Sequence, residues 1–159
     1  MEAIAQLTER IAAYPATIEA ALAAKAADLA DRLRVHVVQD KLSGQVLKVR
    51  TGALRDSIQA EVALDGDRVK ARVFSSGDVK YAAIQEYGGR TAAHEIRPDK
   101  AKALAFQAGG RTVFARIVHH PGSSIPEHAY LRSSLADYAG EIVSELKAAA
   151  LSAIAASST

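Results

Sequence analysis

The sequence is poor in several residue types that define whole classes of protein. It has no cysteine and no tryptophan, and aromatic residues make up 5% of its 159 positions. Without cysteine, disulfides and thiolate metal sites are excluded, and the chain is compatible with folding in the cytosol. No uncharged apolar run reaches the roughly 18 residues of a membrane span, and the first residues lack the basic region of a secretory signal. We therefore expect no membrane partner.

The composition that remains is that of a globular protein. Hydrophobic residues are 49% and charged residues 24% of the chain. The net charge of +2 is too weakly basic to imply nucleic acid as the main partner. A chain of this length can form one core that buries roughly 70% of its unfolded surface. We expect a single domain over residues 1–159.

Apolar residues with a period of 3.6 predict long helices at both ends of the chain, and Pro15 separates the first two. The expected helices are a short one at 2–13 and long ones at about 16–41 and 126–155. Gly140 inside the last one suggests a close neighbour there. A much shorter helix is expected at 81–89, where Gly88 and Gly89 end it. It buries too little to be stable alone, so it must dock on the rest of the fold.

A pattern with a period of two predicts two antiparallel hairpins between the helices. The strand pairs are 58–64 with 69–73, around an Asp-Gly turn, and 103–106 with 112–118. Two long loops are expected at 42–56 and 90–102. The expected fold class is α+β: an antiparallel sheet of about four strands from two hairpins, covered on one face by a long N-terminal and a long C-terminal helix.

Sequence patterns typical of catalysis or metal binding are absent. The five histidines have no HExxH-like spacing, no serine lies in a GxSxG frame, and no glycine pair forms a phosphate loop. We therefore expect no enzyme, no metal and no cofactor. A small hydrolase that uses His120 or Glu86 remains an alternative. The more ordinary role of such a glutamate is to cap a turn or to pair with an arginine.

A string of basic residues surrounds the first loop. It includes Lys48, Arg50 and Arg55. These side chains can form a solvated loop, or they can contact DNA or the acidic surface of a partner. A DNA-binding accessory protein, whose affinity would fall steeply with salt, is therefore a second alternative. No aromatic residues interleave with these charges, so single-strand binding is not indicated.

Several irregular segments, taken in order, resemble one known family. They are residues 50–58 (RTGALRDSI), 81–88 (YAAIQEYG), 120–122 (HPG) and 126–135 (PEHAYLRSSL). Their order and spacing are similar to those of the small tail-completion, tail-terminator or neck proteins of lambda-like siphophages and prophages. The resemblance covers about residues 16–150. Family members usually have Phe where Tyr130 stands, and residues 126–130 also resemble virion-morphogenesis proteins of contractile-tailed phages.

The resemblance implies a structural, non-enzymatic virion protein at the head-to-tail junction. Such proteins form rings, typically hexamers, that terminate the tail tube and dock it to the head connector. The implied partners are further copies of the chain, the tail-tube protein and a head-tail connector or stopper protein, with non-specific DNA in the channel as a possible further contact. The implied location is the tail or neck of the virion, and the host cytoplasm during assembly.

The residues expected at a subunit or partner interface fall into three groups. The basic loop contributes Lys48, Arg50 and Arg55. The short helix contributes Tyr81, Glu86, Tyr87, Gly88 and Gly89. The segment before the last helix contributes His120, Pro121, Gly122 and Tyr130. We expect residues 120–122 to set the turn into the last helix, and Gly88 and Gly89 to direct the chain after them towards a neighbouring subunit.

Overall fold

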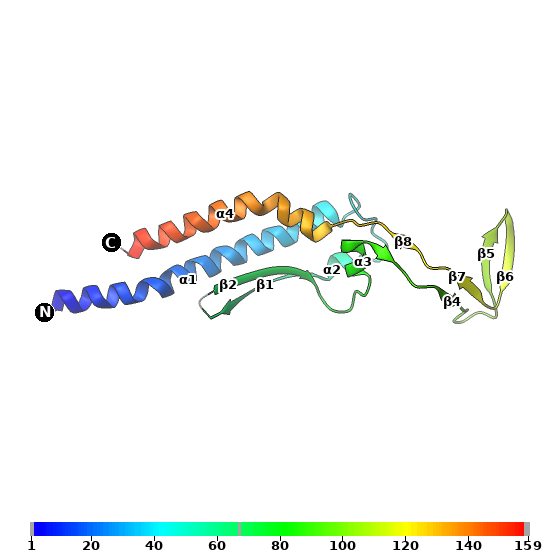
Figure 1. Cartoon of the computed structure of the whole chain (residues 1–159), viewed down its shortest axis with the longest axis horizontal. Helices are drawn as coiled ribbons and strands as arrows, with labels where there is room; N and C mark the ends of the chain where they lie inside the picture. Colours follow the sequence, from blue (N-terminus) through cyan, green and yellow to red (C-terminus); the bar gives the residue numbers. More distant parts are fainter. Residues whose placement is uncertain (1, 67, 158–159) are drawn as a thin grey trace.

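Two long antiparallel helices form the spine of the molecule (Figure 1). The computed structural model describes residues 2–66 and 68–157. Its helices are α1 (Glu2–His36), the π-helical turn η1 (Val37–Lys41), α2 (Ala53–Asp56), α3 (Ala82–Tyr87) and α4 (Tyr130–Ser157). Its strands are β1 (Ile58–Asp65), β2 (Arg68–Ser75), β3 (Gly89–Arg90), β4 (His94–Ile96), β5 (Leu104–Ala108), β6 (Arg111–Ala115), β7 (Val118–His120) and β8 (Ser124–Ile125).

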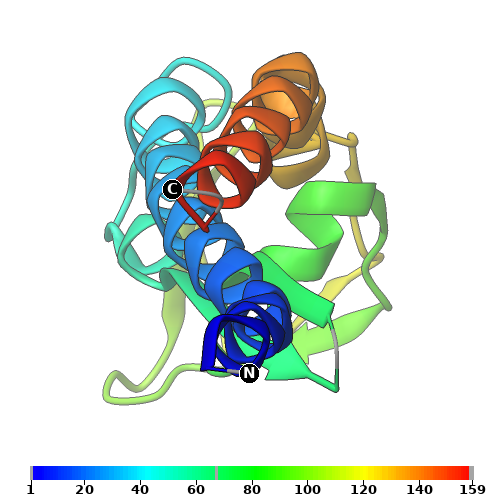
Figure 2. The same ribbon diagram turned by 90° about the vertical axis from the view of Figure 1, so that its left-hand side faces the viewer.

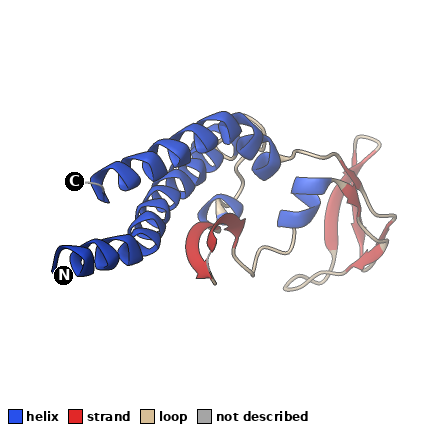
Figure 3. Cartoon of the chain, turned by 60° about the vertical axis from the view of Figure 1, so that its left-hand side comes forward, coloured by secondary structure: helices blue, strands red, loops and turns tan. Residues whose placement is uncertain are grey.

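The molecule has two parts, which we call the body and the arm. The body consists of α1, η1, α2, α3, α4 and the hairpin β1–β2, which packs along α1 (Figures 1 and 2). The arm is residues 89–125, and it extends from the end of the body opposite the two termini (Figure 3). The short strand pairs β3–β8 and β4–β7 join its two limbs, and the hairpin β5–β6 forms its tip.

The core of the body is small and lies near the root of the arm. Val37, Leu42, Leu54, Ile58 and Tyr130 are buried there together. From this cluster a strip of small and leucine side chains continues along α1 towards the termini, and these residues are also buried: Ala26, Leu29, Ala30 and Leu33. Alanine allows the close approach of α1 to its neighbours in a chain that has few aromatic side chains.

The α+β class and both predicted hairpins are confirmed. The hairpins do not join into one four-stranded sheet, because all four ladders of the described residues are two-stranded. The arm explains this difference, since it holds β5–β6 far from β1–β2 (Figure 1). α1 covers β1–β2, whereas α4 packs mainly on α1 rather than on the strands.

Three boundaries also differ from the prediction. α1 runs through Pro15 as one helix, because a missing N–H removes a single hydrogen bond while the alanine-rich flanks favour helix. The expected loop at 42–56 ends in the short helix α2, and the loop at 90–102 contributes to β3 and β4. None of the helices in the described residues has a stretch long and apolar enough to cross a bilayer.

Candidate functional site

Three of the four segments that carried the family resemblance, 50–58, 81–88 and 126–135, meet in the core of the body. Leu54 and Ile58 come from the first segment and Tyr130 from the last, and all three are buried in one cluster. Ala82 of α3 packs against this cluster, and its carbonyl accepts a hydrogen bond of 3.4 Å from the Tyr130 hydroxyl. Burial, with smaller contributions from Glu86 and Tyr87, raises the pKa of Tyr130 to about 12. These segments therefore hold the fold together at the arm root.

Glu86 caps the N-terminus of α4 from a distant part of the chain. Its carboxylate accepts hydrogen bonds from the backbone N–H groups of Leu131 (2.8 Å) and Arg132 (3.0 Å). These are donors that the first turn of a helix leaves unsatisfied, and a negative charge is favoured there by the helix dipole. The side chain is only 4% exposed. The role as a cap and as an ion-pair partner is the ordinary one that the sequence suggested.

Arg132 completes this cap. Its guanidinium donates to the Glu86 carboxylate (3.0 Å), to the Glu86 carbonyl (3.1 Å) and to the Glu127 carboxylate (2.8 Å). It also lies over the Tyr87 ring, 4.7 Å from the ring centroid. Its hydrogen bond to Glu86 is the first cause that raises the pKa of Arg132. The result is one connected polar unit that fixes α3 against α4.

Two glycines allow the backbones to approach at the root of the arm. Gly88 has φ +68°, and a Cβ there would lie 2.8 Å from the backbone nitrogen of Glu127. Gly122 has φ +85°, and a Cβ there would collide with the carbonyl oxygen of Thr91. The limbs of the arm are therefore packed tightly where they meet.

The expectation for residues 120–122 was wrong in its details. His120, Pro121 and Gly122 do not form the turn into the last helix, because α4 begins eight residues after Gly122. They lie in the returning limb of the arm, where the His120 ring nitrogen Nδ1 accepts a 3.0 Å hydrogen bond from the Gly122 N–H. His120 also stacks on His94 across the strand pair β4–β7, with the ring centroids 5.0 Å apart.

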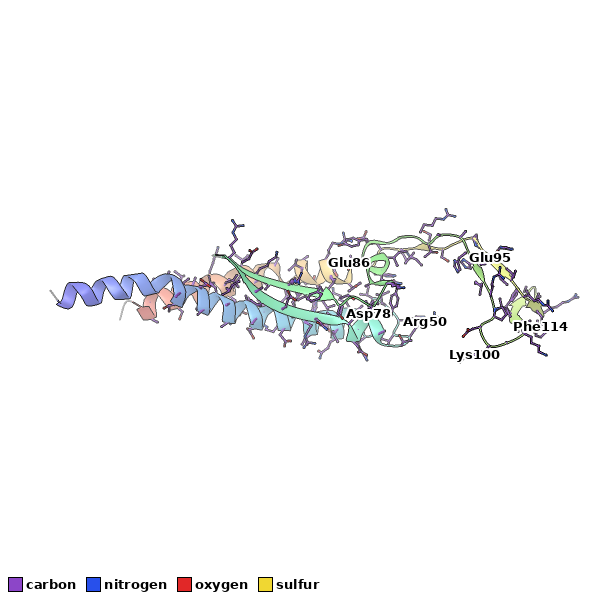
Figure 4. The ribbon with its side chains drawn as sticks, turned by 90° about the horizontal axis from the view of Figure 1, so that it is seen from below. Arg50, Asp78, Glu86, Glu95, Lys100 and Phe114 are labelled. Carbon is purple, nitrogen blue, oxygen red and sulfur yellow. The ribbon has the colours of Figure 1, made fainter. Side chains whose placement is uncertain are left out.

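A hollow of about 340 Å³ opens on the body near the root of the arm, and we call it the basic pocket. Its floor is apolar and includes Leu42, Leu47 and Leu54. Its rim carries all three predicted basic side chains, Lys48, Arg50 and Arg55. Figure 4 shows Arg50 at the end of the body from which the arm leaves.

The charges of the basic pocket are mostly uncompensated. Arg55 pairs with Asp56 at 3.2 Å, whereas Lys48 and Arg50 have no ion pair among the side chains that the structure describes, those of residues 16–66 and 68–157. On the opposite wall lie Tyr81, 43% exposed, and Gln85, whose buried Oε1 atom has no hydrogen-bond partner. An apolar floor and two free cations suit a partner segment with an apolar side chain next to an acidic one.

The structure thus divides the predicted interface residues into three places. Lys48, Arg50, Arg55 and Tyr81 lie together in the basic pocket. The cap of α4 and the core contain Glu86, Tyr87, Gly88 and Tyr130. The arm contains Gly89, His120, Pro121 and Gly122. The roles of Gln85 and Arg132 were not predicted, although both residues lie inside the segments that carried the resemblance.

Among the described residues, no three His, Asp or Glu side chains come together in a way that could hold a metal ion. The chain matches no curated protein and no solved structure. Residues 2–88 match a family described as "Bacteriophage HK97-gp10, putative tail-component". The match spans α1 to α3, and so it includes the basic pocket and the Glu86 cap. The chain belongs to the HK97-gp10-like family of bacteriophage tail components.

Proposed function

We propose that this protein acts at the head-to-tail junction as a closed ring that terminates the tail tube and docks it to the head connector. As a member of a tail-component family, it is a structural protein of the virion. The observation that supports the junction role is that the family-matched part of the chain carries the basic pocket. The ring is a homo-oligomer, and six is the number that the family resemblance implies.

In this proposal the basic pocket receives a segment of the head connector or of the tail-tube protein. A side chain carboxylate would reach Lys48 and Arg50, while an apolar neighbour would contact Leu42 and Leu47. Charged pairs at an interface contribute mainly to the association rate and to the choice of partner. The pocket would therefore orient the ring on its partner, and the contacts between subunits would supply the ring itself.

A deletion of the gene in the phage or prophage that encodes it tests the role directly. Heads and tails should both form, and they should stay unjoined or the tails should have abnormal length in negative-stain images. Normal infectious particles without this protein would contradict the proposal. The wild-type protein should also form rings whose amount rises with concentration. Sedimentation that shows only monomers at every concentration, with tail tubes present, would exclude the ring.

The pocket has its own test. The double variant Lys48→Glu, Arg50→Glu should still form rings but should join heads to tails at least about tenfold less efficiently, because the charge on the rim is reversed. Lys70→Glu, Lys80→Glu is a control with the same charge change on exposed positions outside the pocket lining. Equal joining by the two double variants would show that the pocket is not the docking site. Binding of naked DNA at low salt that only the pocket variant loses would favour a DNA contact instead.

A further inference from the structure

The arm extends away from the body and its strands pair only with one another. The ladders β3–β8, β4–β7 and β5–β6 all lie within residues 89–125. The tip hairpin β5–β6 is the part of the arm farthest from the body (Figures 1 and 3). A two-stranded hairpin without a covering layer is only marginally stable in water. A hairpin held out in this way gains stability if another surface covers it.

One face of the tip hairpin is apolar. The strand register pairs Leu104 with Ala115 and Phe106 with Val113, and directly opposed residues share one face. Phe106 and Val113 are 39% and 38% exposed. The other face is mixed, because Phe114, 71% exposed, lies there with Ala105, and Gln107 donates a 2.9 Å hydrogen bond to the Thr112 hydroxyl. The first face has more apolar side chains, Leu104, Phe106, Ala108, Val113 and Ala115, with Arg111 at its turn end; we call it the tip face.

The body has a hollow of matching character. The apolar groove, with a volume of about 350 Å³, lies between α1, β2 and α4, and its lining includes Leu29, Leu33, Val73, Leu135, Ile142 and Leu146. Cavities of about 150 Å³ can hold one benzene ring, so this groove has room for roughly two apolar side chains of that size. Leu135 is 52% exposed although it belongs to the apolar stripe of α4. Nothing in the described chain fills this groove.

We propose that the tip face of one copy of this chain inserts into the apolar groove of a second copy, an inference that rests on the proposed ring. The arm cannot reach its own groove, because it leads away from the body (Figure 1). The groove and the tip face are different patches, so the contact is head-to-tail, and such contacts close into rings when the rotation between copies permits. Phe106 and Val113 are the residues that fill the groove.

The charge distribution favours a second copy as the occupant. Of the 20 basic and 18 acidic residues in the chain, six and two lie in the arm, which leaves 14 and 16 for the remaining residues. A basic arm is attracted to an acidic body of a neighbour, and it is repelled by the basic pocket. Figure 4 shows Lys100, one of the six basic residues of the arm, at the tip end. DNA would match the charge but would leave the apolar face uncovered.

Cross-linking in this cysteine-free chain tests the contact. Ala108 lies on the tip face beside Phe106, and Ala139 lies one helical turn after Leu135 at the edge of the groove, and both are exposed. A mixture of Ala108→Cys and Ala139→Cys chains should form a disulfide-linked dimer under mild oxidation. Ala105→Cys is the matched control, since it is exposed on the opposite face of the same strand. Equal cross-linking of Ala105→Cys and Ala108→Cys to Ala139→Cys would overturn the proposal.

Complementation between two variants tests whether the tip face of one copy binds the groove of another. Phe106→Glu damages the tip face and Leu135→Glu damages the groove, so each variant alone should need at least about tenfold more protein for ring formation. A mixture of the two should form dimers and nothing larger, because it contains one intact tip face and one intact groove for each pair. Gln107→Glu places the same charge on the other face of the hairpin and should form rings as the wild type does.

Failure of the arm contact and failure of the ring would give different results in these experiments. Rings of Phe106→Glu at the wild-type concentration would overturn the arm contact and leave the ring intact. If those rings then failed to join heads to tails, the arm would be assigned to the connector or tail tube instead. A wild-type protein that stays monomeric with tail tubes present would overturn the ring and the arm contact together.

Discussion

At the scale of single residues, Glu86 has the clearest role. Its buried carboxylate accepts hydrogen bonds from the backbone N–H groups at the start of α4. Glu86→Ala would leave the N–H groups of Leu131 and Arg132 without their acceptor. We expect a loss of about 1–3 kcal/mol in the free energy of unfolding, measured by urea denaturation. Glu127→Ala is the control, because its pair with Arg132 is half-exposed and should contribute less than about 1 kcal/mol. Equal losses for both variants would contradict the capping role.

The raised pKa of Tyr130 predicts that the protein loses stability at alkaline pH. Its pKa is about 12 in the folded protein against an ordinary value of 10.0, so the folded state keeps the proton longer than the unfolded state. The free energy of unfolding should therefore fall as the pH rises from 10 to 12. Tyr130→Phe should remove part of this decline. At pH 7 it should change stability by less than about 1 kcal/mol, since the lost hydrogen bond is long. Identical alkaline curves for both proteins would contradict the assignment.

At the scale of elements, the arm is held at its root by close backbone contacts. Gly122→Ala would force apart the limbs of the arm, because a Cβ meets the Thr91 carbonyl and φ is positive. We expect faster hydrogen exchange in residues 89–125, while the helices of the body exchange as before.

Gly140→Ala is the contrasting variant. The structure leaves open space around Gly140, against our expectation of a close neighbour, so alanine should stabilise α4 by about 0.5–1 kcal/mol.

Ion pairs join α1 to α4 along a line that we call the seam, and they predict how the free energy of unfolding changes in acid. Glu145 accepts hydrogen bonds from Arg32 (2.8 Å) and Lys25 (3.1 Å), and these cations, Arg32 first, hold the pKa of its carboxyl below the ordinary 4.5. The stability that this provides is present above pH 4.5 and is lost as the pH falls through the lower, folded value. Glu145→Gln should therefore be less stable than the wild type at pH 7, and the difference should shrink towards pH 3.

Urea denaturation at a series of pH values checks this difference. Glu19→Gln is the control, since Glu19 lies on α1, the helix that carries Lys25 and Arg32, and has no ion pair among the described side chains. A difference between Glu145→Gln and the wild type that stays constant from pH 7 to pH 3 would show that the seam does not depend on charge.

At the scale of the whole molecule, the arm extends from the body and its strands pair only with one another, so we expect the body to fold without it. Arg90 pairs with Ser124 across the ladder β3–β8, so an Asn-Gly turn can replace residues 91–123 and close this pair as a short hairpin. We expect the shortened protein to unfold within a few degrees of the wild type in thermal melts, and to form no rings in sedimentation. A large loss of stability would show that the arm supports the body.

Much of the fold was predictable, because it depends on local periodicity. The stripe of α4 and the alternation in β1–β2 and β5–β6 each occupy a short stretch of sequence, and each element formed within a few residues of its predicted bounds. The pairing of β3 with β8 and of β4 with β7 was not predictable. These strands have only two or three residues, which is too few for any pattern to show.

The candidate site was predictable in its members but not in their grouping. Lys48, Arg50 and Arg55 were singled out because they are a run of cations in one loop, and they do share a pocket. Tyr81 joined them only because α3 packs beside that loop. Glu86 and Arg132 meet across 46 positions of sequence. No local pattern connects a glutamate with the helix end that it caps.

The amino-acid sequence alone decided where the long helices and the two hairpins lie, where the cations concentrate, and which family the segments resemble. These properties are local, since hydrophobic spacing and turn residues act over a few positions. The long-range packing decided that the two hairpins stay apart, that an arm leaves the body, and that the apolar stripe of α4 lines an open groove. These features depend on contacts between distant residues, whose energies no short window of sequence contains.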